Sequence, residues 1–169
     1  MNPYQESDLA KILRRIFTSV SILWLIFFTM GIIVAGASWA ITGTGKEPLI
    51  KGFSSEQLVQ LRNILIGMGI VEILIGSWFK NRFLKPVQKG TSNNQTKTLS
   101  TVAKNYAQAH LVPASMALSV SFYALALGLM GADRNSILLL LIISFFGLWL
   151  FQPRMKALRA LVTQMGQLS

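Results

Sequence analysis

The sequence of 169 residues predicts an all-α integral membrane protein: a four-helix transmembrane bundle of two hairpins, with amphipathic interfacial segments at both ends. Three observations predict this class. Charged residues make up 13%, about half of the roughly 25% usual in soluble domains. Hydrophobic residues make up 52%, and the mean hydropathy is +0.51. The charges lie between four long apolar runs, which excludes a soluble domain, a disordered chain and a fibrous repeat. We therefore expect a single transmembrane domain over 1–169.

The four apolar runs are long enough to cross a bilayer as helices, because a hydrocarbon core about 30 Å thick needs roughly 20 residues. Each run exceeds the roughly 10 residues of a barrel strand, and none alternates. We expect spans at about 16–41, 58–80, 108–132 and 135–153. A cleaved signal peptide is the alternative for the first run, since Ala35-Gly36-Ala37 resembles a cleavage site. Its apolar stretch exceeds the roughly 7–15 residues of a signal core, which favours a retained span.

Basic residues predict the orientation. Twelve of the 16 Lys and Arg residues lie before the first span, between the second and third spans, or after the fourth. Because Lys and Arg concentrate on the cytoplasmic side, we expect both termini and a linker at 86–99 to be cytoplasmic, in a bacterial-type inner (plasma) membrane. Anionic headgroups are the expected partner of this charge. No nucleic-acid partner is expected, because the basic residues form no binding module.

The segments outside the spans carry their own signals. Before the first span, Leu9, Ile12, Leu13 and Ile16 share one helical face, with Ser7 as a plausible N-cap. Ser54 followed by Gln57 is typical of a capping box before the second span. We expect the second helix to run to Lys85 and the third to begin near Ser100. After Pro153, an amphipathic helix is expected, with its apolar face formed by Met155, Leu158, Leu161, Val162 and Met165.

The two predicted hairpins share a few residues at matching places. Asn63 begins the second span and Asn135 begins the fourth. Gly76-Ser77-Trp78 and Gly147-Leu148-Trp149 lie near the ends of the same two spans. A duplicated hairpin and a chance match are both compatible with so few residues.

Glu72 is the most informative single residue, because it is an acid near the middle of an apolar run. A charge there costs about 2.5–3.5 kcal/mol on insertion scales, and desolvation favours the neutral carboxyl. One interpretation is a proton or cation carrier. The other is a protonated carboxyl that hydrogen-bonds to a neighbouring helix, for which the candidate hydroxyls belong to Ser115, Ser119, Ser121 and Ser144.

The third span carries small residues at alternating steps of three and four, which we call the small-residue seam. Its candidate packing positions are Ala114, Ala117, Ser121, Ala124, Gly128 and Gly131. Small residues at this spacing let helices approach closely, so the seam predicts helix packing, within the chain or between copies. His110 lies at the cytoplasmic end of the same face. It is a candidate proton relay to Glu72, with a hydrogen-bonding residue near the interface as the other interpretation.

No catalytic or cofactor signature accompanies these residues. The chain has no cysteine and one histidine, and it lacks a phosphate-binding glycine loop, HExxH, GxSxG and paired carboxylates. We therefore expect no metal, no cofactor and no enzymatic activity, an enzyme acting on an apolar membrane substrate being the remaining alternative.

The second half of the chain, from Asn105 to Ala160, resembles small four-span bacterial membrane proteins of uncharacterised function. Their last hairpin is distantly similar to the proteolipid c-subunits of rotary ATPases. The resemblance rests on Ala117–Leu127 (ALSVSFYALAL) and on Phe151-Gln152-Pro153-Arg154. Ser119 occupies the place of the proteolipid acid, and the glycine ladder of a rotor-ring helix is missing. The resemblance therefore implies a compact helical fold, and it does not extend to the acid that carries ions in proteolipids.

These observations give two expected functions. The first is a small membrane accessory, assembly or scaffold subunit that acts through helix–helix contacts, as a homo-oligomer or in a larger membrane complex. The alternative is a proteolipid-like proton or cation translocator centred on Glu72. The two differ in whether Glu72 must ionise.

Overall fold

The computed structural model describes residues 3–43, 48–84 and 95–166, and every regular element in these ranges is an α-helix. The helices are α1 (Pro3–Gly43), α2 (Ser55–Phe83), α3 (Gln95–Leu129), α4 (Arg134–Leu150) and α5 (Met155–Gly166). α1, α2 and α3 each contain a stretch long and apolar enough to cross a membrane. α4 and α5 supply a fourth if they count as one broken span, bent by 41° between them. The sequence-based prediction of an all-α chain with several apolar spans is thus confirmed at this level.

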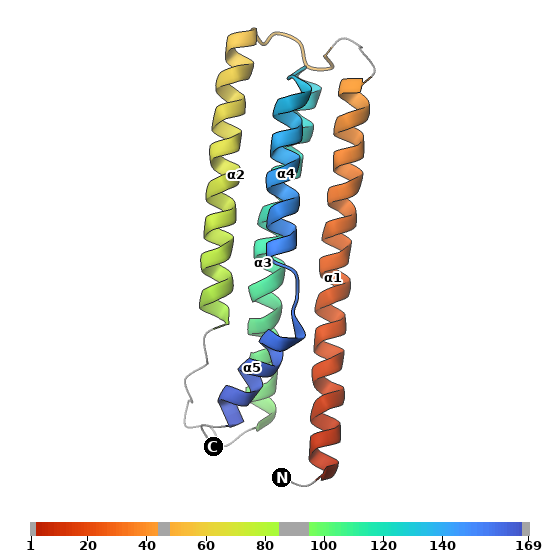
Figure 1. Cartoon of the computed structure of the whole chain (residues 1–169), viewed down its shortest axis with the longest axis vertical. Helices are drawn as coiled ribbons and strands as arrows, with labels where there is room; N and C mark the ends of the chain where they lie inside the picture. Colours follow the sequence, from red (N-terminus) through yellow and green to blue (C-terminus); the bar gives the residue numbers. More distant parts are fainter. Residues whose placement is uncertain (1–2, 44–47, 85–94, 167–169) are drawn as a thin grey trace.

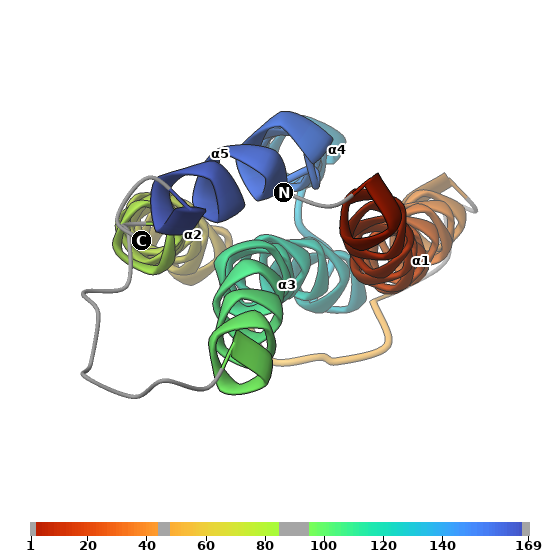
Figure 2. The same ribbon diagram turned by 90° about the horizontal axis from the view of Figure 1, so that it is seen from below.

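The helices surround α3, which packs against α1, α2 and α4 (Figures 1 and 2). α1 and α2 flank the α3–α4 pair on opposite sides, and within the described residues no Cα atoms of these two helices approach within 8 Å. Seen end-on, the four long helices form a rhombus with α3 and α4 on its short diagonal. The expected pairing of the first two spans as a hairpin is therefore wrong.

Close approaches to the α3–α4 pair explain this arrangement. In α2, a Cβ on Gly69 would lie 3.0 Å from Val120 of α3. In α1, a Cβ on Gly31 would lie 3.2 Å from Leu148 of α4. Ala117 of α3 is fully buried, and a Cβ on Gly147 of α4 would lie 2.8 Å from it. Because small residues allow such approaches, α1 and α2 each pack on α3 and α4 rather than on each other.

Three boundaries differ from expectation. α1 is continuous from Pro3, so the N-terminal amphipathic segment extends the first helix and Ser7 lies inside it rather than at its N-cap. α2 ends at Phe83, with Leu84 as its C-cap, before the expected end at Lys85. α3 begins at Gln95, so residues 95–99 of the predicted linker 86–99 are helical. The rest of that linker lies outside the described residues.

Capping interactions fix the other helix ends. The predicted capping box of α2 is confirmed: the Ser54 hydroxyl accepts from the Gln57 backbone N–H, and the Gln57 side chain accepts from the Ser54 N–H. Asp133 caps α4 by accepting from the backbone N–H of Ser136 at 3.1 Å.

The end of α3 corrects one seam position. Gly131 lies beyond the last helical residue, Leu129, with φ of +84°, which favours glycine. The N–H of Gly131 donates to Gly128, and the N–H of Ala132 donates to Leu127. This is the Schellman pattern of a glycine-terminated helix. Gly131 therefore ends the helix and is exposed instead of continuing the seam.

Pro153 separates α4 from α5, because proline cannot donate to the preceding turn and its ring collides with the backbone there. α5 then turns along the lower part of α1 and α3 (Figure 1). Its apolar face is largely buried: Leu158 and Leu161 pack with Val20 of α1 and with Val102 and Tyr106 of α3. The segment expected to lie at the interface thus packs against two other helices.

Candidate functional site

The carboxyl group of Glu72 lies between α2 and α3, partly buried. On α3, Ser119 and Tyr123 are one helical turn apart and both face it. The Tyr123 hydroxyl donates to one carboxyl oxygen of Glu72 at 2.5 Å, and the Ser119 hydroxyl lies in hydrogen-bond contact with the other oxygen. Ser119 is one of the four serines that the sequence suggested as partners. The acid thus bridges two helices through two hydroxyl groups.

A count of hydrogens indicates which form of Glu72 fits this arrangement. The Ser119 oxygen also lies 2.6 Å from the carbonyl oxygen of Met116, in the preceding turn of α3. A hydroxyl has one hydrogen, so Ser119 donates either to Met116 or to Glu72. If Glu72 is protonated, it donates to Ser119, Ser119 donates to Met116, and every contact has a hydrogen. If Glu72 is ionised, one of the two short contacts has none. A neutral carboxyl therefore gives each of these contacts a hydrogen of its own.

His110 lies elsewhere, at the broken end of α4. Its side chain is fully buried, and its Nδ1 donates to the Phe151 carbonyl oxygen at 2.9 Å. Its other ring nitrogen, Nε2, is buried and has no hydrogen-bond partner among the described residues. On α3, Ser119 lies nine positions after His110, a rise of about 13.5 Å. The structure therefore does not bring His110 and Glu72 together as a proton relay would require.

Side chains from three helices bond the carbonyls at the end of α4. Trp24 of α1 donates to Leu148 at 3.0 Å, and Lys80 of α2 donates to Leu150 at 2.6 Å. From α3, His110 donates to Phe151, and Tyr106 donates to Arg154 at 3.2 Å. The last carbonyls of a helix lack backbone partners, and three of these donors satisfy such carbonyls at the end of α4. The fourth, Tyr106, bonds the Arg154 carbonyl at the start of α5, which also accepts from the Ala157 N–H. His110 therefore belongs to a structural clamp that holds α4 in place.

The small-residue seam is used inside the molecule. Ala114, Ala117, Ser121 and Ala124 are each 0% exposed, and Gly128 is buried near Ser38 and Ile137. The hydroxyls of Ser121 and Ser144 lie 2.6 Å apart, and Ser144 donates to the carbonyl of Ala117 at 2.7 Å. The seam therefore packs α3 against its neighbours in this chain and leaves little of itself for another copy.

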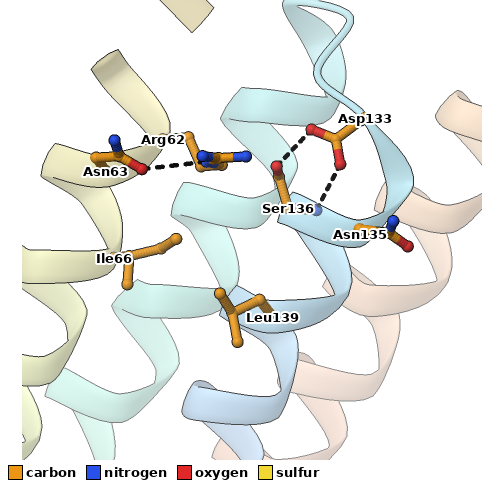
Figure 3. Close-up of a pocket in the computed structure, with 7 residues that line it drawn as sticks. All are labelled: Arg62, Asn63, Ile66, Asp133, Asn135, Ser136 and Leu139. Atoms are coloured by element: carbon orange, nitrogen blue, oxygen red, sulfur yellow. Dashed lines mark hydrogen bonds between the residues drawn. The ribbon is translucent and has the colours of Figure 1, made fainter. Parts of the chain in front are cut away.

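A pocket of about 350 Å³, with a mainly apolar accessible lining, lies at the opposite end, between α2 and α4 (Figure 3). The residues that line it are Arg62, Asn63, Ile66, Asp133, Asn135, Ser136 and Leu139. In Figure 3, the Arg62 side chain extends from α2 towards the Asp133–Ser136 turn. Hydrogen bonds from Ser136, helped by the charge of Arg62, hold the pKa of Asp133 below its ordinary value of 3.8. This carboxylate is therefore ionised at neutral pH.

Sequence reasoning missed two parts of these sites. Tyr123 lies four residues after Ser119, so helical spacing already puts it on the same face. Asn63 and Asn135, matched in sequence as span starts, line one pocket in space. Arg62 and Asp133 beside them are the only charges there among the described residues, and a pairing of span starts would have indicated the pocket. In the described ranges, no three His, Asp or Glu residues gather as a metal site would need.

Comparison with protein-family models, with curated proteins and with solved structures gives no match to this chain. The expected similarity to proteolipid c-subunits therefore stays a prediction.

Proposed function

We propose that the chain is a small scaffold or accessory subunit of a membrane complex. In this proposal the helices form a transmembrane bundle with both termini cytoplasmic, in a bacterial-type inner membrane. The protein acts by presenting rigid helix surfaces to partner helices and performs no chemistry of its own.

The bonding of Glu72 carries this proposal. The carboxyl contacts two hydroxyls of α3 and has a complete set of hydrogens only in its neutral form. A neutral acid that joins two helices stabilises packing, because a carboxyl in an apolar span is costly unless it is bonded. The interior polar contacts at Ser121–Ser144 and at the end of α4 also join helices. The polar contacts of the interior thus hold the helices in a fixed arrangement.

The outward faces supply the surface for partners. Only 6% of the apolar window of α2 and 17% of that of α1 are buried, against 44% for α3. On α1, Gly36 is exposed, with no atom within 4 Å of a Cβ built there, and Ala40 lies one turn further on the same side. Two small residues four apart are typical of close helix–helix contact in membranes. We assign partner contacts, to another copy or another subunit, to this face of α1.

The translocator is the second candidate, because Glu72, Ser119 and Tyr123 are only partly buried. A partly buried carboxyl between α2 and α3 is accessible to a neighbouring ion-conducting subunit, whereas a fully buried carboxyl would not be. Under this alternative, Glu72 must exchange a proton or cation during function.

Replacement of Glu72 distinguishes the scaffold proposal from the translocator proposal. If Glu72 is structural, Glu72→Gln keeps a donor and an acceptor and should leave stability in detergent close to that of the original protein. Glu72→Ala should lose about 0.6 kcal/mol and up to ~2, as measured for hydrogen bonds between transmembrane helices. Ser119→Ala should lose a similar amount. Ser115→Ala is the matched control, because Ser115 is exposed on α3 and bonds only within its own helix, to Val112.

Proton flux into proteoliposomes provides the second readout. The scaffold proposal expects flux no higher than in empty liposomes, unchanged by Glu72→Gln. Flux that requires the original protein and disappears in Glu72→Gln, with folding intact, would replace the scaffold by the translocator.

The assembly itself is tested by mass measurement after extraction in mild detergent. Gly36→Ile should reduce the mass of the extracted complex, because the larger side chain separates helices that pack on that face. Gly67→Ile is the control, since Gly67 of α2 is equally open, with nothing within 4 Å of a Cβ. Equal masses for all three proteins would remove α1 from the proposed contact surface.

A further inference from the structure

The pocket between the starts of α2 and α4 has charges of both signs whose bonding capacity is unused. Within the described residues, the Arg62 guanidinium makes one hydrogen bond, from Nε to the Asn63 side-chain oxygen at 3.2 Å. Arginine has five N–H donors, so four remain. Asp133 accepts two hydrogen bonds, from the N–H and the hydroxyl of Ser136. A carboxylate has about four acceptor positions, so about two remain.

These two groups face each other without bonding to each other. Arg62 is close enough to lower the pKa of Asp133, yet the recorded bonds of the two side chains go to Asn63 and Ser136. Figure 3 shows the Arg62 side chain extending from α2 towards α4, where both helices line the pocket. A ligand that fits must present an anion to the guanidinium and a cation to the carboxylate.

The rest of the lining holds polar and apolar residues in a definite order, and most of the accessible lining of the pocket is apolar. Asn63, Asn135 and Ser136 lie at the level of the charges. Ile66 and Leu139 lie about one turn further along α2 and α4, towards the apolar middle of the spans. A molecule in this pocket thus has its charged part at the helix ends and its apolar part along the helices, as a membrane lipid does.

We propose that this pocket binds the headgroup of an aminophospholipid of the phosphatidylethanolamine class. The Arg62 guanidinium binds the phosphate, and the Asp133 carboxylate accepts hydrogen bonds from the primary ammonium. A planar guanidinium matches phosphate oxygens with two parallel N–H bonds. The volume of about 350 Å³ lies within the range of ligand pockets. This inference rests on the membrane location in the proposed function and on neither the scaffold role nor the role of Glu72.

Lipid binding by the purified full chain is measured in nanodiscs that contain equal amounts of three lipids with identical acyl chains. The headgroups are phosphoethanolamine, phosphocholine and phosphoglycerol, and the retained lipid is identified by mass spectrometry. We expect the phosphoethanolamine lipid to be retained about tenfold over each of the others, since one charge-assisted hydrogen bond corresponds to about that factor. Choline offers no N–H donor, and glycerol offers no cation.

Two variants test the roles of Arg62 and Asp133 separately. Arg62→Gln should reduce retention of all three lipids. Asp133→Asn should abolish the preference for phosphoethanolamine while it preserves retention of phosphate lipids in general, and asparagine caps a helix as well as aspartate does. Arg134→Gln is the matched control, because Arg134 is the next residue and lies over the Trp39 ring, outside this pocket. It should change nothing.

The outcomes are distinct. Equal retention of the three lipids, or a preference that survives both pocket variants, would overturn the proposal. Soluble phosphoethanolamine that competes at millimolar concentration as well as the lipid does would assign the site to a free solute instead. A negative result in the assembly or Glu72 experiments described above would leave the lipid preference intact. Failure of the scaffold proposal is therefore distinguishable from failure of the lipid-binding proposal.

Discussion

Gly147 of α4 is the most crowded position among the described glycines. A Cβ added there would lie 2.1 Å from Cδ1 of Ile73 in α2 and 2.8 Å from Cβ of Ala117 in α3. The end of the Ile73 side chain can rotate away, but Cβ of Ala117 is fixed to the α3 backbone. Gly147→Ala therefore forces α3 and α4 apart. The open Gly36 of α1 provides the comparison, because nothing lies within 4 Å of its added Cβ.

The expected magnitude follows from two opposed effects. Gly→Ala inside a helix stabilises it by about 0.5–1 kcal/mol. Overpacking of a filled interior costs about 1–3 kcal/mol. Both glycines are inside helices, so the helical gain cancels when the two variants are compared. We expect Gly36→Ala to be neutral or slightly stabilising, and Gly147→Ala to be about 1–3 kcal/mol less stable than Gly36→Ala.

The assay is reversible unfolding of the purified chain in mixed micelles, followed by the loss of helical circular dichroism. A double variant, Gly147→Ala with Ala117→Gly, moves the methyl group from α3 to α4 and removes the fixed collision. We expect it to recover most of the loss. Gly147→Ala as stable as Gly36→Ala, or no recovery in the double variant, would refute the claim that α3 and α4 touch at this point.

Three further predictions concern other parts of the structure. Ala124→Leu should destabilise the packed helices by about 1–3 kcal/mol, because its site is fully buried. Phe122→Leu, at a 45% exposed site, should change the stability little. Equal tolerance of the two substitutions in unfolding experiments would contradict the burial of the seam. His110→Phe should cost about 1–3 kcal/mol because it leaves a buried carbonyl without a donor, and unchanged unfolding would remove the residue from the α4 clamp. Reporter fusions after Leu168 should report cytoplasm and those near Gly45 the outer side, and the reverse pattern would overturn the orientation drawn from the basic residues.

Local rules accounted for much of the fold. The apolar runs predicted the long helices, and Ser54 with Gln57 predicted the start of α2, because both signals act within one turn or one span. The cap at Asp133 and the Schellman end at Gly131 are equally local, but neither was predicted, and Gly131 was assigned to the seam instead.

The pairing of helices was not predictable in the same way. Chain neighbours usually pack together, so α1 and α2 were expected to form a hairpin. Which helices pack together depends on contacts between residues far apart in sequence, such as Gly31 with Leu148 and Gly69 with Val120. No local pattern encodes such a choice.

The candidate sites were likewise predictable from the sequence only in part. Glu72 stands out because an acid is rare in an apolar run, and its partner Ser119 was among the hydroxyls suggested by the sequence. The bond of His110 to Phe151 was not foreseen, since it depends on where Pro153 ends α4. A residue whose chemistry is unusual for its surroundings, such as Glu72, can be identified from the sequence. A residue that bonds the backbone of another helix, such as His110, can be identified only from the fold.

The unbroken length of α1 has a mechanical consequence. Its 41 residues extend about 61 Å, twice the roughly 30 Å of a bilayer core. Val20 packs with α3 and α5 towards one end, and Ser38 lies beside Gly128 towards the other. A rigid helix moves as a unit, so a tilt of about 10° about its midpoint would move each end by about 5 Å in opposite directions and would disturb the contacts at both levels. A partner that pushes on one end of α1 would therefore be sensed at the other, without any change in the helix between them.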